Sequence, residues 1–282
     1  MSQIDNSKRT AKTEQQPAGY PDLKSHEEEI LIVVKTYPRP STSYKEIVCT
    51  AGITRNERWI RLYPVNYRYM QYPKWYKKYQ WVKVKIEKNL KDFRVDSYRP
   101  DVESIKPEGQ PLDTKKDKSW LQRKEIVIPT IHYNSLEEIA NDYKKFGVSL
   151  GIFKPKKIID LKIKADSAQW SSKHQRVQSQ LVLFGQQPKT LKKIPYKFIY
   201  EFICNDSRCK GHQLSIFDWE IFMLYLRLME EKPFSMDIVL KKIKQKWLDE
   251  MWSEKRDSYL IVGTQFPNPT FLVLGVFWPP KY

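Results

Sequence analysis

The sequence predicts an α+β protein that contains two small antiparallel β-barrels in tandem and a pair of helices near the C-terminus. Two observations lead to this expectation. Short segments that are either continuously apolar or strictly alternating recur along the chain, and prolines and polar turn residues separate them. Hydrophobic residues make up 40% of the 282 residues, which is enough to form a core and excludes a wholly disordered chain.

The first half of the chain has the pattern of a small barrel. Residues 1–29 are polar and show no apolar periodicity, so we expect a disordered arm there. Residues 30–34 are continuously apolar, as in a buried strand. Further strands are expected at residues 47–53, 58–63 and 81–88, with Pro64 ending the second of these. Together they predict an OB-like or PUA-like β domain over residues 30–120.

Residues 121–282 are expected to form a second, α+β domain. Ser135 and Glu138 have the spacing of a capping box, which predicts a helix that starts there and ends at Gly147. In the strand predicted at 157–164, the core-facing residues should be Ile159, Leu161 and Ile163. The other expectations are loops at 101–119 and 165–195, strands at 125–129, 196–204 and 214–216, helices at 218–229 and 235–253, and a terminal hairpin of strands at 259–263 and 270–277.

The charge of the chain indicates a class of partner. It carries 50 Lys and Arg residues against 33 Asp and Glu residues, a formal net charge of +17. Residues 1–29 contain four basic and six acidic residues, so the excess belongs to the part that is expected to fold. Polyanions such as nucleic acids are therefore the first partners to consider.

Hydropathy and cysteine content indicate a compartment. No run of 18 apolar residues occurs, and the mean hydropathy is -0.65, so we expect no membrane-spanning helix. Residues 1–16 lack the apolar region of a secretory signal. Three cysteines are too few for a disulfide framework. These features predict a cytoplasmic protein.

The most unusual segment is residues 66–94, with nine Lys or Arg residues, two acidic residues and eight aromatic ones. Cations can follow a phosphate backbone, and flat rings can stack on unpaired bases at about 1–3 kcal/mol each. The segment therefore predicts a surface for DNA or RNA, single-stranded or duplex. The expected phosphate contacts are Arg68, Lys74, Lys77, Lys78, Lys83 and Lys85, and the expected stacking rings are Tyr69, Trp75, Tyr76 and Trp81. The alternative is structural, because such rings often cover the rim of a small sheet beneath lysine stems.

A cluster of potential metal ligands follows the strand predicted at 196–204. Cys204, Cys209 and His212 have the spacing C-x4-C-x2-H, and thiolate and imidazole are usual zinc ligands. A tetrahedral structural site needs a fourth ligand. Candidates for that position are Cys49, His132 and His174. The alternative to a zinc site is a turn that contains two reduced cysteines and a hydrogen-bonded histidine.

Signatures of catalysis are weak. Asp160 and Lys162 have the strand pattern of restriction-type nucleases, in which the acid binds Mg²⁺ and the lysine polarises water, but an ordinary half-buried strand has the same pattern. Asp218 and Glu220 could form a catalytic carboxylate pair, although a helix N-cap and a first-turn acid explain both residues. The common phosphate-loop, metalloprotease and serine-hydrolase motifs do not occur. A non-enzymatic role is therefore favoured.

Several strings of the sequence together resemble an uncharacterised bacterial family of about this length. They are residues 35–38, 48–53, 58–64, 96–101, the segment from Cys204 to Glu220, and residues 275–280. More loosely, they resemble the dual-OB-containing domain proteins. The resemblance implies tandem small barrels and, by analogy of fold, nucleic-acid binding. The Cys204–His212 cluster and the C-terminal helical pair are additions to the looser pattern.

Three functional hypotheses follow from these observations. The first is a nucleic-acid-binding accessory protein, for example in bacterial defence against phages or mobile elements. The second is a metal-dependent nuclease that uses Asp160 and Lys162 or the Cys/His cluster. The third is an interaction subunit of a multi-subunit defence complex, whose basic face docks an acidic protein.

Overall fold

The computed structural model describes residue 20 and residues 24–114, 120–179, 188–231, 234–265 and 269–281. Most of the predicted arm lies outside the described residues. Its end does not, because the first strand, β1 (His26–Lys35), begins four residues before the expected start at Ile30. Residues 26–29 pair with residues 83–86 of another strand, so the polar end of the arm is an ordered extension of β1.

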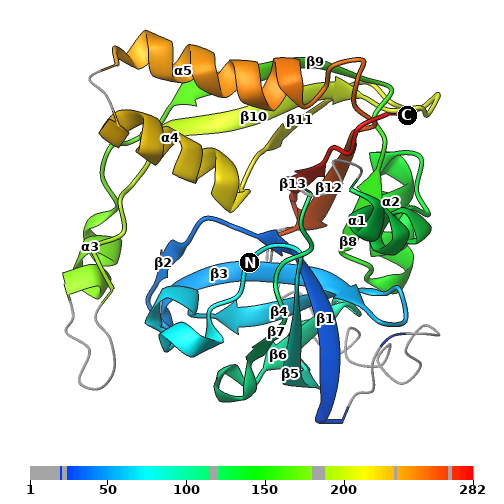
Figure 1. Ribbon diagram of the computed structural model, residues 1–282, viewed down its shortest axis with the longest axis vertical. Coiled ribbons are helices and arrows are strands. Elements are labelled where there is room, and N and C mark those ends of the chain that lie inside the picture. The colour runs from blue at the N-terminus through cyan, green and yellow to red at the C-terminus, as the bar shows by residue number, and fades with distance from the viewer. Residues whose placement is uncertain are drawn as a thin grey trace, which may run out of the picture.

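A closed five-stranded β-barrel forms the first half of the molecule (Figure 1). The pairing runs β1–β3–β4–β6–β5 and returns to β1, which pairs with both β3 and β5. Only the contact between β4 and β6 is parallel. The short strands β2 and β7 pair in antiparallel fashion with β3 and β5, respectively. The bounds are β2 (Arg39–Ser41), β3 (Lys45–Thr54), β4 (Trp59–Val65), β5 (Gln80–Lys88), β6 (Ser97–Pro100) and β7 (Lys106–Glu108). The α+β class and the OB-like barrel are confirmed.

Strand β1 is buried on both of its faces, which explains its continuous apolar run. Ile30 and Ile32 point into the barrel, where they belong to the same core cluster as Val82 and Val84 of β5. Leu31 and Val33 alternate with them and belong to a second cluster that includes residues of the C-terminal half, such as Ile152 and Ile261. A strand with only one buried face would have alternated, as β5 does.

The second half contains two three-stranded antiparallel sheets. Their orders are β11–β10–β9 and β13–β12–β8, and a single bridge between Ile216 and Val273 joins them. The pairings among the described residues do not close these sheets into a second ring, so only the first of the two expected barrels is seen closed. The bounds are β8 (Leu150–Phe153), β9 (Lys157–Ala165), β10 (Tyr196–Ile203), β11 (His212–Ser215), β12 (Tyr259–Thr264) and β13 (Phe271–Phe277).

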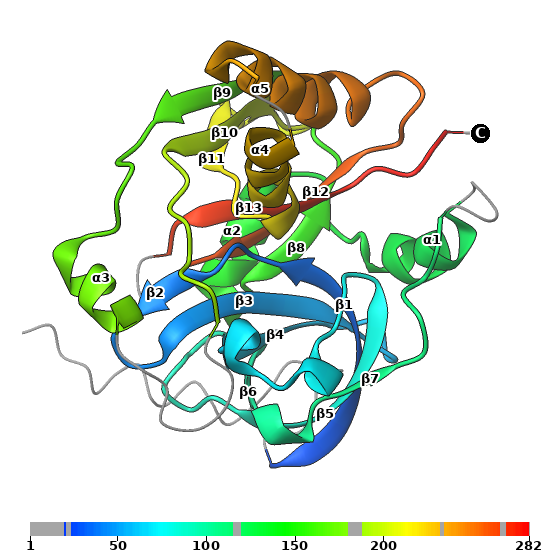
Figure 2. The same cartoon turned by 60° about the vertical axis from the view of Figure 1, so that its left-hand side comes forward.

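The predicted helical pair is present as α4 (Trp219–Glu231) and α5 (Met236–Lys244), and a π-helical turn, Gln245–Glu250, continues α5. Helix α4 lies between α5 and the barrel (Figures 1 and 2). Helix α2 (Leu136–Phe146) begins and ends as expected. The Ser135 hydroxyl accepts a hydrogen bond from the Glu138 N–H at 3.2 Å, and Gly147 adopts a left-handed φ of 77° after the last turn.

Several segments have a secondary structure that the sequence pattern did not predict, among them the short strands β2, β6 and β8. Residues 125–129 were expected to be a strand but belong to α1 (Leu121–Val127) and a 3-10 turn, Ile128–Thr130. A short apolar run does not separate strand from helix, and here Val127 is buried whereas Ile128 is exposed. The expected loop at 165–195 contains α3 (Ser172–Ser179).

Three further differences concern β4, β9 and the expected loop at 101–119. Strand β4 continues through Pro64 to Val65, with a cis peptide bond between Tyr63 and Pro64. In β9 the register shifts so that Ile158 and Asp160 have strand partners and the residue between them does not. That bulged residue is Ile159, which is 50% exposed and does not face the core as predicted. The expected loop at 101–119 contains β7.

Substitution of Gly52 should prevent the barrel from packing. A Cβ atom at this position would collide with the Leu31 carbonyl oxygen and lie 2.6 Å from Ile30 Cγ2, because β1 and β3 cross closely there. We expect Gly52→Ala to lower the free energy of unfolding by more than about 2 kcal/mol in urea titrations. Gly109→Asn is the matched control, because nothing lies near that position and Asn tolerates its positive φ. Equal stability of both variants would contradict this packing.

Candidate binding cleft and metal centre

A cleft of about 1700 Å³ lies between the barrel and the C-terminal helices. Nine Lys or Arg side chains, two glutamates and eight aromatic rings line it. The barrel side contributes Tyr67, Arg68 and Trp75, and the helical side contributes Trp219 and Lys246. The cleft is therefore basic, aromatic and shared by both halves of the chain.

Part of the predicted basic and aromatic segment forms one wall of this cleft. Trp75 is 37% exposed, packs against Tyr67 with ring centroids 5.4 Å apart, and donates a hydrogen bond from its indole to the Met70 carbonyl. Arg68 extends from the turn Tyr67–Tyr69 and forms an ion pair with Glu46. These contacts fix the positions of Arg68 and Trp75 and leave much of the indole ring facing the cleft.

Lys78 has a different role from the phosphate contact that the sequence suggested. Its ammonium lies 2.9 Å from Asp218 Oδ2 and 3.2 Å from Glu220 Oε2, and its side chain is only 10% exposed. Burial opposes the charge, but the two carboxylates outweigh it and hold the pKa of Lys78 above its usual range. Because both carboxylates stand at the beginning of α4, Lys78 joins the barrel to this helix and its charge is already neutralised.

The strand β13 passes close to this ion pair. A Cβ atom on Gly275 would lie 3.1 Å from Asp218 Oδ2 and 3.8 Å from Lys78 Nζ. The Asp218 carboxylate also accepts a hydrogen bond from the Glu220 N–H at 2.9 Å. Asp218 therefore caps α4, as its sequence position suggested, and at the same time binds the buried lysine.

Lys35 lies against the same wall, at the end of β1. Its ammonium is 3.7 Å from the centroid of the Tyr67 ring and 4.3 Å from that of Trp219. Burial, together with the neighbouring charge of Lys78, lowers the pKa of Lys35 to about 7, and Glu220 offsets this shift in part. No local pattern singles out Lys35, because the residue belongs to a buried strand and its partners lie 32 to 185 positions away.

Tyr76 does not present its ring to a ligand. The side chain is 0% exposed, its hydroxyl lies 2.7 Å from the Thr50 hydroxyl, and its ring meets Tyr67 edge-on at 5.0 Å. The expected stacking role is therefore wrong for this residue. Aromatic rings in the segment 66–94 were indistinguishable in sequence, although some of them form the core of the barrel.

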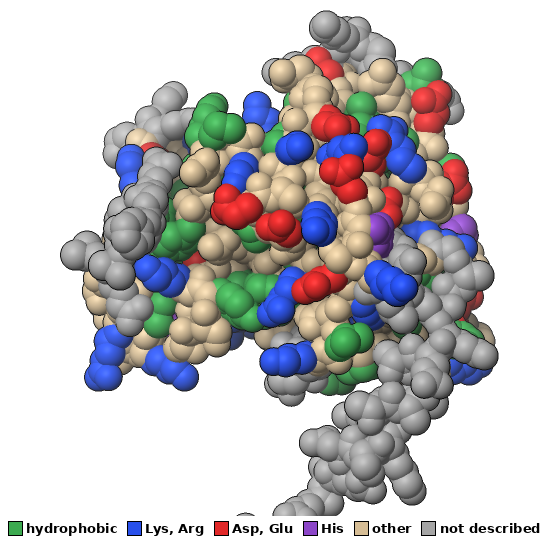
Figure 3. Space-filling model, turned by 90° about the horizontal axis from the view of Figure 1, so that it is seen from below, with side chains coloured by type: hydrophobic (Ala, Val, Ile, Leu, Met, Phe, Trp, Pro, Cys, Tyr) green, Lys and Arg blue, Asp and Glu red, His purple; other side chains and the backbone are tan. Residues whose placement is uncertain are grey.

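The charged face of β5 points away from the cleft. Lys83 forms an ion pair with Glu27 at 2.7 Å, and the Arg55 guanidinium covers the Trp81 ring at 3.5 Å. Lys74, on the turn Tyr72–Lys74, forms an ion pair with Glu103. Figure 3 shows that acidic side chains stand among the basic ones on the lower face of the molecule. The remaining predicted residues, Tyr69, Lys77 and Lys85, do not line the cleft.

The opposite wall of the cleft carries cations that the sequence analysis did not assign. Lys242 and Lys246 are one helical turn apart and both face the cleft. Lys246 and Arg256 approach the Trp278 ring at 4.5 and 4.6 Å. The i,i+4 spacing of Lys242 and Lys246 can be read from the sequence, but the barrel wall that faces them cannot.

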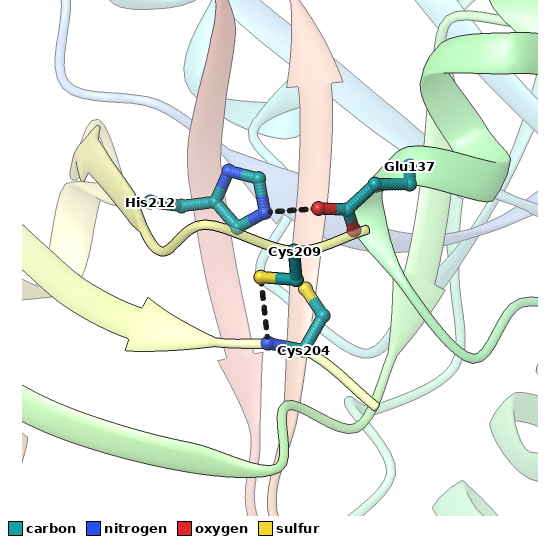
Figure 4. A group of neighbouring side chains, drawn as sticks. All are labelled: Glu137, Cys204, Cys209 and His212. Carbon is teal, nitrogen blue, oxygen red and sulfur yellow. Dashed lines mark hydrogen bonds and ion pairs between the residues drawn. The ribbon is translucent and has the colours of Figure 1, made fainter. Parts of the chain in front are cut away.

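The Cys/His cluster has its ligand atoms together. Cys204 and Cys209 lie in the loop between β10 and β11, His212 is the first residue of β11, and Glu137 comes from the first turn of α2 (Figure 4). One ligand atom from each of the four residues lies within 4.8 Å of the others. His212 Nε2 is 2.9 Å from Glu137 Oε1, and the Cys204 N–H donates a hydrogen bond to Cys209 Sγ at 3.2 Å. The set of two thiols, one imidazole and one carboxylate can hold a tetrahedral ion.

The surroundings of the cluster suit an ion. Burial raises the pKa of the Cys204 thiol, so a thiolate there needs a compensating positive charge. Glu137 Oε2 is buried and has no hydrogen-bond partner among the described residues. The Ser135 hydroxyl binds Asp206 at 3.1 Å, which fixes the loop to the start of α2.

None of the three expected fourth ligands is in the cluster. The fourth residue is Glu137, whereas Cys49 accepts a hydrogen bond from the Arg61 guanidinium at 3.0 Å in the barrel half. His132 and His174 belong to no such group among the described residues. Glu137 lies 75 positions from His212, so the sequence could not indicate that the two side chains meet.

The nuclease pattern does not assemble a metal site in the described chain. Asp160 forms an ion pair with Lys244 of α5 at 2.8 Å, and Lys162 forms one with Glu201 of β10 at 2.7 Å. The single group of three or more potential metal ligands found in the described ranges is the one around Glu137. Each of the two strand residues therefore has a structural partner.

The chain was compared with known protein families. Residues 131–282 match the family described as Domain of unknown function DUF8757, and these residues are more than half of the chain. The chain belongs to the DUF8757 family. Residues 26–129 match a second family, described as Domain of unknown function DUF8758. No curated protein matches the chain.

Residues from both matched segments line the cleft. The DUF8757 segment contains all four residues of the Glu137, Cys204, Cys209 and His212 cluster and the wall formed by α4 and α5, whereas the DUF8758 segment contains the barrel wall. The cleft therefore needs both segments. Among the described helices of either segment, none is long and apolar enough to cross a membrane.

Substitution of Lys78 should lower the stability of the fold, because its ammonium neutralises a buried carboxylate. Lys78→Met would leave the buried Asp218 carboxylate without its partner, so we expect the free energy of unfolding in urea to fall by about 3–5 kcal/mol. Lys77→Met, which removes an exposed neighbouring charge, should change it by less than about 0.5 kcal/mol. Adding Asp218→Asn to Lys78→Met should restore part of the loss, and a double variant no more stable than the single one would contradict the pairing.

Proposed function

We propose that this chain binds nucleic acid, preferably single-stranded, in the cleft between the barrel and helices α4 and α5. The observation that supports this proposal is the arrangement of cations and partly exposed rings from both halves around one cavity. Proteins that bind single strands combine a positively charged groove with aromatic side chains on which the bases stack. The protein as a whole also carries a net charge of +17.

The charges of the cleft favour an anionic occupant. Two of its cations already have acidic partners on the surface, because Lys192 pairs with Glu230 and Lys246 with Glu250. No ion pair of the described residues includes Lys242 or Arg256. Exposed ion pairs contribute little stability, so a phosphate chain can replace the surface carboxylates at small cost.

The rings favour unpaired bases. Trp75 is the most exposed of the barrel-wall rings, and Arg256 lies over Trp278 on the opposite wall. A base can stack on the free side of such a ring only when it has left a duplex. The structure therefore supports a revised form of the sequence hypothesis, in which Trp75 remains a stacking contact, Arg68 lines the cleft while paired with the buried Glu46, and the face of β5 does not take part.

The cleft hypothesis can be tested by removing two charges from α5 and its continuation. Lys242→Gln combined with Lys246→Gln should weaken binding of a fluorescent single-stranded oligonucleotide about tenfold at low salt. The slope of log affinity against log salt should become less steep by roughly 1.4, from about 0.7 per phosphate contact on a single strand. Fluorescence anisotropy measures both quantities.

The matched control removes the same number of charges from the same segment outside the cleft. Lys241→Gln combined with Lys244→Gln should leave affinity and salt slope close to those of the wild type, because neither side chain lines the cleft. Equal losses in the two double variants would show that general basicity explains binding. Absence of binding to DNA and RNA at low salt would refute the proposal.

We further propose that the cluster around Glu137 binds one zinc ion with a structural role. Four protein ligands fill a tetrahedral site, and the buried Cys204 thiol and the unpartnered Glu137 Oε2 both suit a cation. An ion there would tie the loop between β10 and β11 to α2, because the ligands come from both elements.

Metal analysis of the purified protein tests the zinc proposal. We expect about one zinc per chain, and Cys209→Ser should lose the metal and unfold at a lower temperature. Cys49→Ser is the control with the same chemical change outside the cluster and should keep the metal. A wild-type protein that contains no zinc after growth in zinc-supplemented medium, and does not bind it in titration, would contradict the proposal.

The remaining sequence hypotheses stay predictions. A role in bacterial defence, an acidic protein partner and a cytoplasmic location all depend on charge, resemblance and cysteine content. The thiols of Cys49, Cys204 and Cys209 are free, which fits a reducing compartment such as the cytoplasm.

A further inference from the structure

Lys35 is an amine in an unusual position for a lysine of a strand end. Its ammonium lies between the Tyr67 and Trp219 rings, and both rings line the cleft. No ion pair of the described residues includes it. The nearby acidic groups, Asp218 and Glu220, are held by Lys78. A partly buried amine therefore lies directly against two rings of the cleft wall and has no ion-pair partner among the described residues.

We propose that Lys35 is a nucleophile that forms an imine with an aldehyde presented in the cleft. The inference rests on the proposed nucleic-acid binding for the identity of the ligand. The aldehyde that a nucleic-acid strand offers is the ring-opened sugar left where a base has been lost. The chemical class of the ligand is therefore an abasic site in a single strand.

The surroundings of Lys35 provide two of the usual means of activating a lysine. A lysine becomes nucleophilic when an apolar site desolvates it or when another cation stands beside it. Lys35 has both, because it is packed against aromatic rings and the charge of Lys78 is close enough to affect it. Burial and the neighbouring charge of Lys78 lower the pKa of Lys35 to about 7, whereas the π faces of the two rings favour the ammonium form.

The reaction needs no external oxidant or reductant. The Lys35 nitrogen lone pair attacks the aldehyde carbon, and the carbonyl electron pair moves to oxygen, which takes up a proton to give a carbinolamine. The nitrogen loses its two protons in turn, the hydroxyl group takes up a second proton and leaves as water, and a C=N bond forms. Glu220 is placed to transfer these protons, because its carboxylate lines the cleft and interacts with Lys35 and Lys78.

Borohydride trapping tests the proposal, because it reduces the imine to a stable secondary amine. Incubation with a single-stranded oligonucleotide that contains one abasic site should give a covalent complex on a denaturing gel, and peptide mapping should place the adduct on Lys35. Lys35→Arg keeps a cation between the rings but is not a nucleophile of this kind, so it should reduce trapping at least tenfold. Lys241→Arg is the matched control outside the cleft and should trap normally.

Two further measurements separate this proposal from the proposed function and from misfolding. Lys35→Arg should bind the intact oligonucleotide within about twofold of the wild type and unfold at a similar temperature. Trapping of the wild type with pyridoxal phosphate, a small phosphorylated aldehyde, should label Lys35 first even if nucleic acid does not bind. Normal trapping by Lys35→Arg would overturn the inference, and so would labelling by both probes at residues other than Lys35. If the wild type binds intact strands but traps no abasic strand, the imine proposal fails and the proposed nucleic-acid binding stands.

Discussion

The ion pair between Lys78 and Asp218 is the contact on which the proposed site depends. Lys78 follows the aromatic turns of the barrel, and Asp218 caps α4, so a single buried interaction fixes the position of one cleft wall relative to the other. Breaking such a pair leaves a charge buried without compensation, and this cost makes the arrangement specific even though a buried pair need not add much net stability. Gly275 permits it, because a side chain there would crowd both charged groups.

The basic residues of the chain include those paired with acidic residues on the surface and those that line the cleft. Much of the basic excess is used in local pairs, such as Lys83 with Glu27 on the barrel surface and Lys162 with Glu201 on the second sheet. Such pairs present little net field to a ligand. The cleft contains ion pairs as well, at Arg68, Lys78, Lys192 and Lys246, but its nine cations come from both halves of the chain and face one another across a shared cavity. Low-dielectric walls around a region of one sign concentrate its field, which is the physical reason to place a polyanion there.

Local signals predicted the fold well, and long-range contacts decided the site. Alternation in residues 81–88 and the capping box at Ser135 each depend on neighbours within a few positions, and the structure confirms both. The bulge at Ile159, the burial of Tyr76 and the ion pair of Lys78 depend on residues far along the chain. Glu137 shows the limit best, because only its distance to His212 makes it a candidate ligand.

The metal cluster and the cleft are close along the chain, and this links their stabilities. His212 begins β11, the strand ends at Ser215, and Asp218 follows only three residues later at the start of α4. Backbone hydrogen bonds from Phe217 to Val273 and from Tyr37 to Phe217 hold the segment between β11 and α4 in place. An ion held by the four residues of the cluster would therefore fix the position of β11. Through β11 it would also fix the Asp218 carboxylate that pairs with Lys78. A change at the cluster should reach the cleft through this short connection, although no ligand of the cluster lines the cleft.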